Sequence, residues 1–251
     1  MTAVGQARRG VVAVLGVEVA DGLRAILREP AALFFSVLMP VMFFAIFAGI
    51  FGAGQPGVMA AMLAQYGTFG VVSVMLMNPG IGVAADRETG WLRLKKVSAA
   101  PVGATVGGKV LASLPYALAV LLALSAVTMA VAGPTMPLLT WLRVVGVLLA
   151  GSLPFAFLGL AVGFVTSTNA AAAVLNAVFF PMVIASGLWV PLNLLPGFVQ
   201  AVAPFLPTYQ LAALAQAQLT GADATVPVLA LLATAAVTGG LAALAYRNLR
   251  V

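Results

Sequence analysis

The longest charge-free stretch of the chain sets the strongest limit on its fold. From Ala31 to Ala85 there is not one Asp, Glu, Lys or Arg. About 20 apolar residues suffice to cross a hydrocarbon core, where charge is costly. The whole chain is 63% hydrophobic and 7% charged, whereas a soluble domain is roughly 25% charged. The sequence therefore predicts an all-α membrane protein with a single transmembrane domain over residues 1–251.

Six apolar segments of about the length that a bilayer requires follow one another along the chain. They cover residues 31–51, 58–84, 110–132, 142–166, 170–190 and 225–246. Ahead of them, residues 11–28 carry Glu18, Asp21 and Arg24 on one helical face and apolar side chains on the other. This pattern predicts an amphipathic helix lying in the membrane interface. Because these charges interrupt the first apolar run, we do not expect a cleaved signal peptide.

The segment between the fifth and sixth predicted spans has a different character. Residues 191–222 are apolar but contain four prolines: Pro191, Pro196, Pro204 and Pro207. Such a segment is too broken to span a bilayer and too apolar for a free loop. We expect short helices that dip into the outer interface or fold back between spans, as an outer re-entrant segment.

The distribution of Lys and Arg predicts the orientation. With the N-terminus in the cytoplasm, six crossings return the C-terminus there. Eleven of the 12 Lys and Arg residues then lie on the inner side, and Arg143 alone lies on the outer side. This is a strong positive-inside bias, so the net charge of +6 indicates topology rather than nucleic-acid binding.

The residue types present exclude most catalytic chemistry. The chain has no Cys and no His, which removes thiolate ligands, the usual zinc ligand and the commonest general base. Ser186 lies in an apolar segment, but it has no His to form a nucleophilic pair. We therefore predict no catalytic residue and no metal site in this chain.

A partial nucleotide-binding motif also fails on inspection. Residues 103–109 read Gly-x-x-x-x-Gly-Lys, but Val110 stands where a phosphate-binding loop needs Ser or Thr for magnesium. We predict that this chain is not an ATPase and that any ATP and magnesium are bound by a partner.

The predicted cytoplasmic loop, residues 86–109, combines charge with apolar side chains. It begins Asp-Arg-Glu-Thr-Gly-Trp-Leu-Arg-Leu-Lys-Lys and later contains Pro101 and Lys109. A loop that only fixes topology does not need Trp91 and two leucines. The pattern predicts a short amphipathic helix that docks into a groove on a cytoplasmic partner.

Two stretches resemble the ABC-2 type permease family. The first is the Arg-Glu-x-Gly pattern at residues 87–90, followed by Leu, a basic cluster, Pro and a later Lys. The second is Ser-Gly-Leu-Trp-Val-Pro at residues 186–191, followed by Leu195-Pro196 and Tyr209. It is similar to the connection between spans five and six, especially in drug-export members.

The resemblance implies a transport subunit of the bacterial inner membrane that has no motor of its own. Two permeases, identical or paralogous, would pair and rest on separate cytoplasmic ABC ATPase subunits. Such complexes usually export, and the uncharged spans suit an amphipathic drug-like, lipid or glycan-lipid substrate. The family's functional positions then map onto two sets: the ATPase-coupling residues Arg87, Glu88, Gly90, Trp91 and Leu94, and the outer residues Pro191, Pro196 and Tyr209.

Two other functions remain as alternatives. An ion-coupled secondary transporter normally carries ionisable groups within its spans, and here Asp86 and Arg143 lie at span ends. A membrane assembly protein without transport activity is the second alternative.

Overall fold

The computed structural model describes residues 16–17, 19–20, 24, 38–52, 55–92 and 102–248, and within these residues every regular element is a helix. Their order is α3 (Met39–Phe47), the π-helix η2 (Ala48–Gly52), α4 (Pro56–Glu88), α6 (Val102–Ala132), α7 (Leu138–Gly151), α8 (Leu153–Gly163), α9 (Thr168–Ala185), η3 (Leu192–Leu194), α10 (Gly197–Val202), η4 (Ala203–Phe205), α11 (Pro207–Thr220) and α12 (Thr225–Arg247). The predicted all-α class is confirmed. The interfacial helix predicted over residues 11–28 lies almost wholly outside the described residues.

Five segments are long and apolar enough to cross a membrane. They are Pro56–Glu88, Gly107–Ala132, Leu138–Gly163, Thr168–Ala185 and Thr225–Arg247. A sixth would be the pair Gly197–Phe205 and Pro207–Thr220, which is bent by 78°. The first predicted span, 31–51, is described only from residue 38, and its apolar helix there covers Met39–Ile50. The structure therefore supports five or six spans by length and composition.

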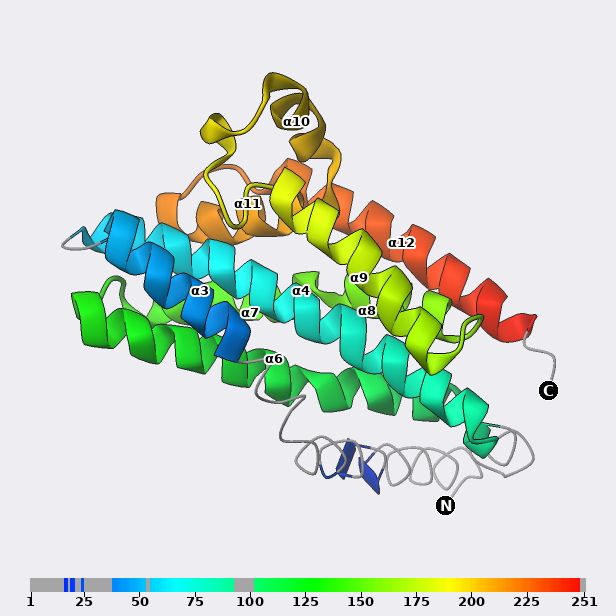
Figure 1. The fold of residues 1–251 in the computed structure, drawn as a ribbon. Helices are drawn as coiled ribbons and strands as arrows, with labels where there is room; N and C mark the ends of the chain where they lie inside the picture. The colour runs from blue at the N-terminus through cyan, green and yellow to red at the C-terminus, as the bar shows by residue number, and fades with distance from the viewer. Residues whose placement is uncertain are drawn as a thin grey trace, which may run out of the picture.

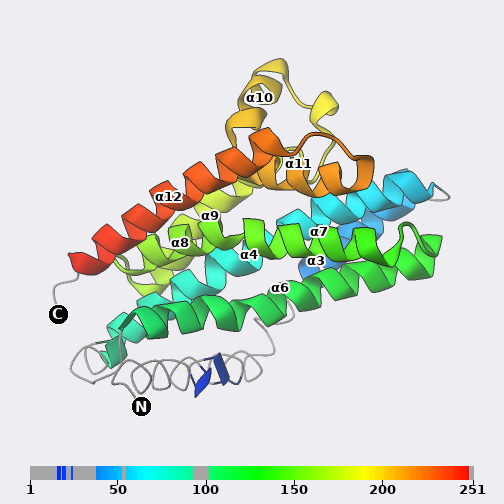
Figure 2. The same cartoon turned by 180° about the vertical axis from the view of Figure 1, so that it is seen from behind.

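Helix α4 forms the centre of the bundle, with α3, α6, α8, α9 and α11 packed around it (Figures 1 and 2). Its most apolar stretch is 67% buried within the chain, against 11% for that of α12. Small residues let the neighbours approach closely. A Cβ placed on Gly159 would lie 2.1 Å from the Leu76 carbonyl oxygen, and one on Gly163 would lie 2.1 Å from that of Gly80. The Gly-x-x-x-Gly pattern of α8 thus serves packing within the subunit.

Boundaries differ from the prediction where helices continue past the apolar run. α4 extends to Glu88, so Asp86 belongs to a helix rather than to a loop. The fourth predicted span consists of α7 and α8, which meet at Ser152. Pro154 explains this break, because it has no N–H to donate to the carbonyl four residues earlier.

An aromatic cluster joins α3, α4 and α9. The Trp189 ring stacks on Phe43 at 5.2 Å between centroids and meets Phe69 edge-on at 5.5 Å. Phe69 in turn stacks on Phe179 of α9 at 5.5 Å. The Tyr66 hydroxyl donates a hydrogen bond of 3.2 Å to the Trp189 carbonyl oxygen. These contacts fix the chain immediately after α9 against the bundle.

Candidate functional site

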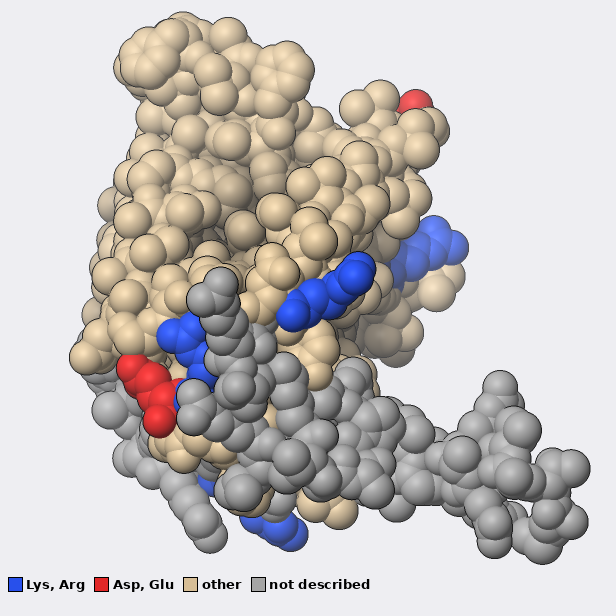
Figure 3. Space-filling view, turned by 90° about the vertical axis from the view of Figure 1, so that its right-hand side faces the viewer, with Lys and Arg blue, Asp and Glu red and all other residues tan. Residues whose placement is uncertain are grey.

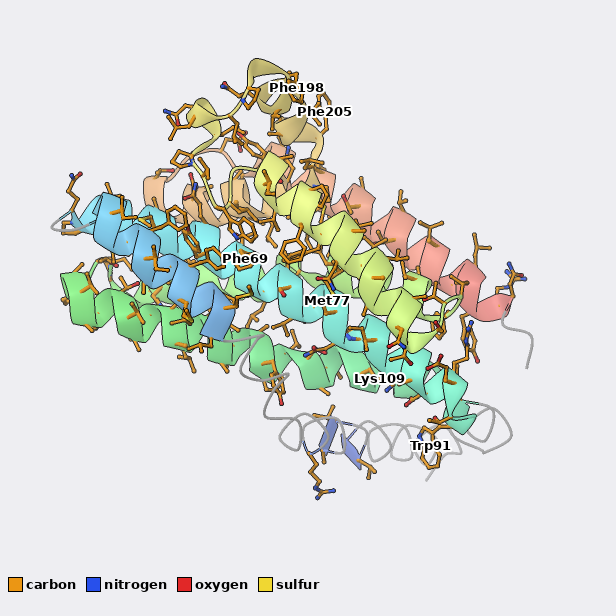
Figure 4. All side chains as sticks on the ribbon, in the orientation of Figure 1. Phe69, Met77, Trp91, Lys109, Phe198 and Phe205 are labelled. Atoms are coloured by element: carbon orange, nitrogen blue, oxygen red, sulfur yellow. The ribbon has the colours of Figure 1, made fainter. Side chains whose placement is uncertain are left out.

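The end of α4 carries three charged residues in succession: Asp86, Arg87 and Glu88. The helix stops beyond them because Gly90 adopts a left-handed conformation with φ of +74°, which glycine accepts without a Cβ clash. The Gly90 N–H donates to the Arg87 carbonyl at 3.2 Å. Lys109 and Trp91 both lie at this end of the bundle (Figure 4). Viewed end-on, cationic and anionic side chains lie next to one another here (Figure 3).

Asp86 joins α4 to α6. Its Oδ2 lies 3.0 Å from Lys109 Nζ, and both side chains are about one fifth exposed, at 19% and 21%. The same ammonium donates a hydrogen bond of 3.1 Å to the Gly82 carbonyl oxygen, one turn earlier on α4. Because the pair is partly buried, dissolved salt screens it less than it screens an ion pair on an open surface. The contact therefore fastens the start of the third predicted span to the end of the second.

Arg87 joins α4 to the end of α8. Its Nη1 donates a hydrogen bond of 2.8 Å to the carbonyl oxygen of Phe164, the residue that caps α8 at its C-terminus. The last carbonyls of a helix lack partners within the helix and form the negative end of its dipole. The Arg87 guanidinium supplies both a hydrogen-bond donor and a positive charge at this helix end.

Glu88 joins α4 to the start of α9. Its Oε2 accepts a hydrogen bond from the hydroxyl of Thr168, the first residue of α9. A carboxylate is favourable here because the N-terminus of a helix is the positive end of its dipole. Ser167 precedes Thr168 as the N-cap, with its Oγ accepting from Ala170 N–H at 3.3 Å.

The predicted coupling residues are therefore only partly in the described structure. The Trp91 side chain is half exposed, whereas Leu92 is buried with 1% exposure. Leu94 and the basic cluster after it lie outside the described residues. Contact of this region with an ATPase stays a prediction.

The motif that resembles a nucleotide-binding loop is helical in this structure. Residues 103–109 belong to α6, and the Lys109 ammonium is engaged with Asp86 and Gly82. A phosphate-binding loop instead needs a strand before it and free backbone N–H groups. This chemistry does not fit residues 103–109.

The predicted outer residues lie at the beginnings of short helices. Pro191 precedes η3 and Pro196 precedes α10, while Tyr209 lies in the first turn of α11. The segment bearing α10 projects sideways from the bundle and carries Phe198 and Phe205, which are 75% and 84% exposed (Figure 4). The Ser186 hydroxyl, at the end of α9, is hydrogen bonded to that of Thr208 on α11. The segment is thus made of short bent helices, and its entry into the membrane stays a prediction.

Sequence reasoning alone missed the partners of these charges. Phe164 has only a backbone role and Thr168 looks like an ordinary turn residue, so neither gave a signal. The Asp86–Lys109 pair did have one: opposite charges at the facing ends of consecutive spans.

A bundle of long apolar helices with its charge gathered at the helix ends defines a polytopic membrane protein. The sequence model of the ABC-2 type transporter family matches residues 16–219, so the chain belongs to that family. A relative in Bacillus subtilis (strain 168), named "Putative transport permease YvfS", is 23% identical over 195 residues. The match covers 74% of this chain and 78% of that protein. The chain is accordingly a transport permease subunit, and the family implies an ATPase partner.

Proposed function

We propose that this permease is the membrane subunit of an ATP-driven exporter that moves an amphipathic drug-like, lipid or glycan-lipid substrate outward. The observation that carries the proposal is the separation of charge from the spans. Within α4 the first charged residue is Asp86, 30 positions after the helix begins at Pro56. An ion-coupled carrier would need ionisable groups inside its membrane spans. ATP hydrolysis by a partner is therefore the better candidate for the energy source.

The second element of the proposal is the docking of cytoplasmic ATPase subunits beyond the end of α4. Asp86, Arg87 and Glu88 end the helix there, and Trp91 follows with half of its surface exposed. An exposed indole beside charges is typical of a surface that receives a partner. ATP and magnesium would be bound by that partner, and two permease copies or paralogues would complete the transporter in the bacterial inner membrane, with both termini in the cytoplasm.

Co-expression with bacterial ABC ATPase subunits tests this proposal. We expect the ATPase to co-purify with the permease, and we expect inside-out vesicles to accumulate a lipophilic dye or a fluorescent phospholipid with ATP but not with vanadate. A Walker-lysine variant of the ATPase serves as the control. Absence of both co-purification and vanadate-sensitive accumulation would overturn the proposal.

A further inference from the structure

Arg87 and Glu88 hold the two ends of one short turn. The turn between α8 and α9 covers residues 164–167. Arg87 donates to the carbonyl oxygen of Phe164, the first residue of the turn, and Glu88 accepts from the hydroxyl of Thr168, the first residue after the turn. Each charge has the sign that its helix end favours: the cation lies at the C-terminus of α8 and the anion at the N-terminus of α9. We call this arrangement the turn clamp.

The next residue along the chain, Thr89, takes no part in the clamp. Thr89 follows Glu88, but its hydroxyl bonds to the carbonyls of Ala85 at 2.9 Å and Asp86 at 3.3 Å, both in its own helix. The clamp also reaches further into the bundle, because the Phe164 ring packs on Tyr246 of α12 at 5.4 Å. Two side chains of α4 are therefore placed to act on three other helices.

The two helices that the clamp holds differ in how else they are fixed. α8 is already joined to α4 through the close approach of Gly159 and Gly163. α9 packs less of its surface within the chain, with 28% of its apolar stretch buried and with Val174, Val178 and Ile184 exposed. The cytoplasmic end of α9 thus depends on Glu88 and Thr168 more than α8 depends on Arg87.

We infer that Arg87 and Glu88 are positioning residues that transmit movement from the cytoplasmic segment after Gly90 to α8 and, above all, to α9. This inference rests on the proposed function, because the movement comes from the ATPase. A displacement of the α4 end would move the turn with it while the clamp is closed. Without the clamp, α4 would move and α9 would lag behind.

A fluorescent label on α9 tests the inference without knowledge of the substrate. The chain has no cysteine, so Val178→Cys, on the exposed side of α9, takes bimane at one site. The assay uses the purified complex of labelled permease and ATPase, with and without vanadate trapping. We expect trapping to change the bimane emission in the otherwise wild-type chain. We expect Thr168→Val or Glu88→Ala to reduce that change about three-fold or more, because either variant removes the hydrogen bond that joins α4 to α9.

Three further variants separate transmission from folding. Glu88→Gln keeps an acceptor oxygen and should retain most of the response. Thr89→Val makes the same chemical change as Thr168→Val one residue from the clamp, and it should leave the response intact. The double variant Glu88→Ala/Thr168→Val should be no worse than either single variant, because both remove one interaction. Size-exclusion profiles and co-purified ATPase should match those of the wild type.

Each other outcome has a definite meaning. A full bimane response in Glu88→Ala and Thr168→Val overturns the clamp, as does a wild-type complex in which α9 does not respond to trapping. Loss of ATPase binding in Glu88→Ala but not in Thr168→Val would show that Glu88 contacts the ATPase directly, which also overturns the clamp. Failure of any ATPase to bind the wild-type permease would overturn the proposed function instead.

Discussion

The middle and the charged C-terminal end of α4 are held by different interactions. In the middle, Gly159 and Gly163 bring the α8 backbone against the carbonyls of Leu76 and Gly80. At the end, Asp86, Arg87 and Glu88 reach α6, α8 and α9 through long polar side chains. The first arrangement has no room for adjustment, whereas side chains at the second can break and re-form contacts with water close by.

This difference indicates which part of the molecule can move. Backbone contact between helices tolerates almost no displacement, because protein interiors are close-packed. A polar contact near water exchanges at low cost, since net hydrogen-bond energies are only about 1 kcal/mol. The bundle is therefore rigid along the middle of α4 and adjustable at its charged C-terminal end.

The largest effect is expected from breaking the rigid region. In Gly159→Ala the new Cβ lies 2.1 Å from the Leu76 oxygen, so α4 and α8 must separate, at a cost of about 3 kcal/mol. Gly146→Ala on α7 is the matched control, because nothing lies within 4 Å of its new Cβ. Thermal unfolding in detergent measures both variants. Equal stability of the two would show that the close approach is not needed.

The adjustable end is tested by its ion pair. Lys109→Met leaves the Asp86 carboxylate partly buried without its ammonium partner, and we expect it to lower the unfolding free energy by about 2 kcal/mol. Arg143→Met removes an exposed cation of α7 and should change stability by no more than about 0.5 kcal/mol. Similar losses in both variants would mean that the pair contributes nothing specific.

Two buried tyrosines, one hydrogen bonded and one without a partner in the described part of the chain, test the contribution of polar contacts in the core. Tyr66→Phe removes the 3.2 Å hydrogen bond to the Trp189 carbonyl and should cost about 1 kcal/mol. The Tyr116 hydroxyl is buried and has no hydrogen-bond partner among the described residues, so Tyr116→Phe should be neutral or stabilising. Denaturant titration followed by Trp fluorescence compares the two. A greater loss in Tyr116→Phe would contradict this assignment.

The smallest effect is expected in the turn between α11 and α12. The Thr225 hydroxyl and backbone N–H donate to Asp223 and lower the pKa of its carboxyl. A lowered pKa in the folded state means that the stabilisation is present at neutral pH and is lost as the pH falls through that pKa. Asp223→Ala should therefore differ slightly from the wild type in melting temperature at pH 7 and converge with it in acid. A difference that grows in acid would reverse the sign.

The sequence predicted the fold class because long apolar runs are a local feature of the chain. The charge-free run from Ala31 to Ala85 indicates hydrocarbon wherever the helices lie in space. Helix ends were less predictable, since α4 continues through three charged residues that also suit a loop. Gly90, with its left-handed conformation, marks the true end.

Contacts within the candidate site were beyond sequence reasoning. Gly159 and Gly163 suit approach to any helix, and only the structure shows that α4 is their partner. Likewise, Arg87 binds a backbone carbonyl, which every residue possesses, so no side chain at position 164 identifies it. Residue types predict which groups seek partners, while the topology decides which partners they find.

Our central proposal is that the segment after the charged end of α4 faces the cytoplasm and receives the ATPase. The most direct measurement places a photo-crosslinking amino acid at one of two positions in cells that express the partner ATPase. They are Trp91, which is 50% exposed, and Phe205, which is 84% exposed on the projecting segment that bears α10. We predict an ATPase adduct from position 91 and none from position 205. An adduct from position 205 alone would contradict it.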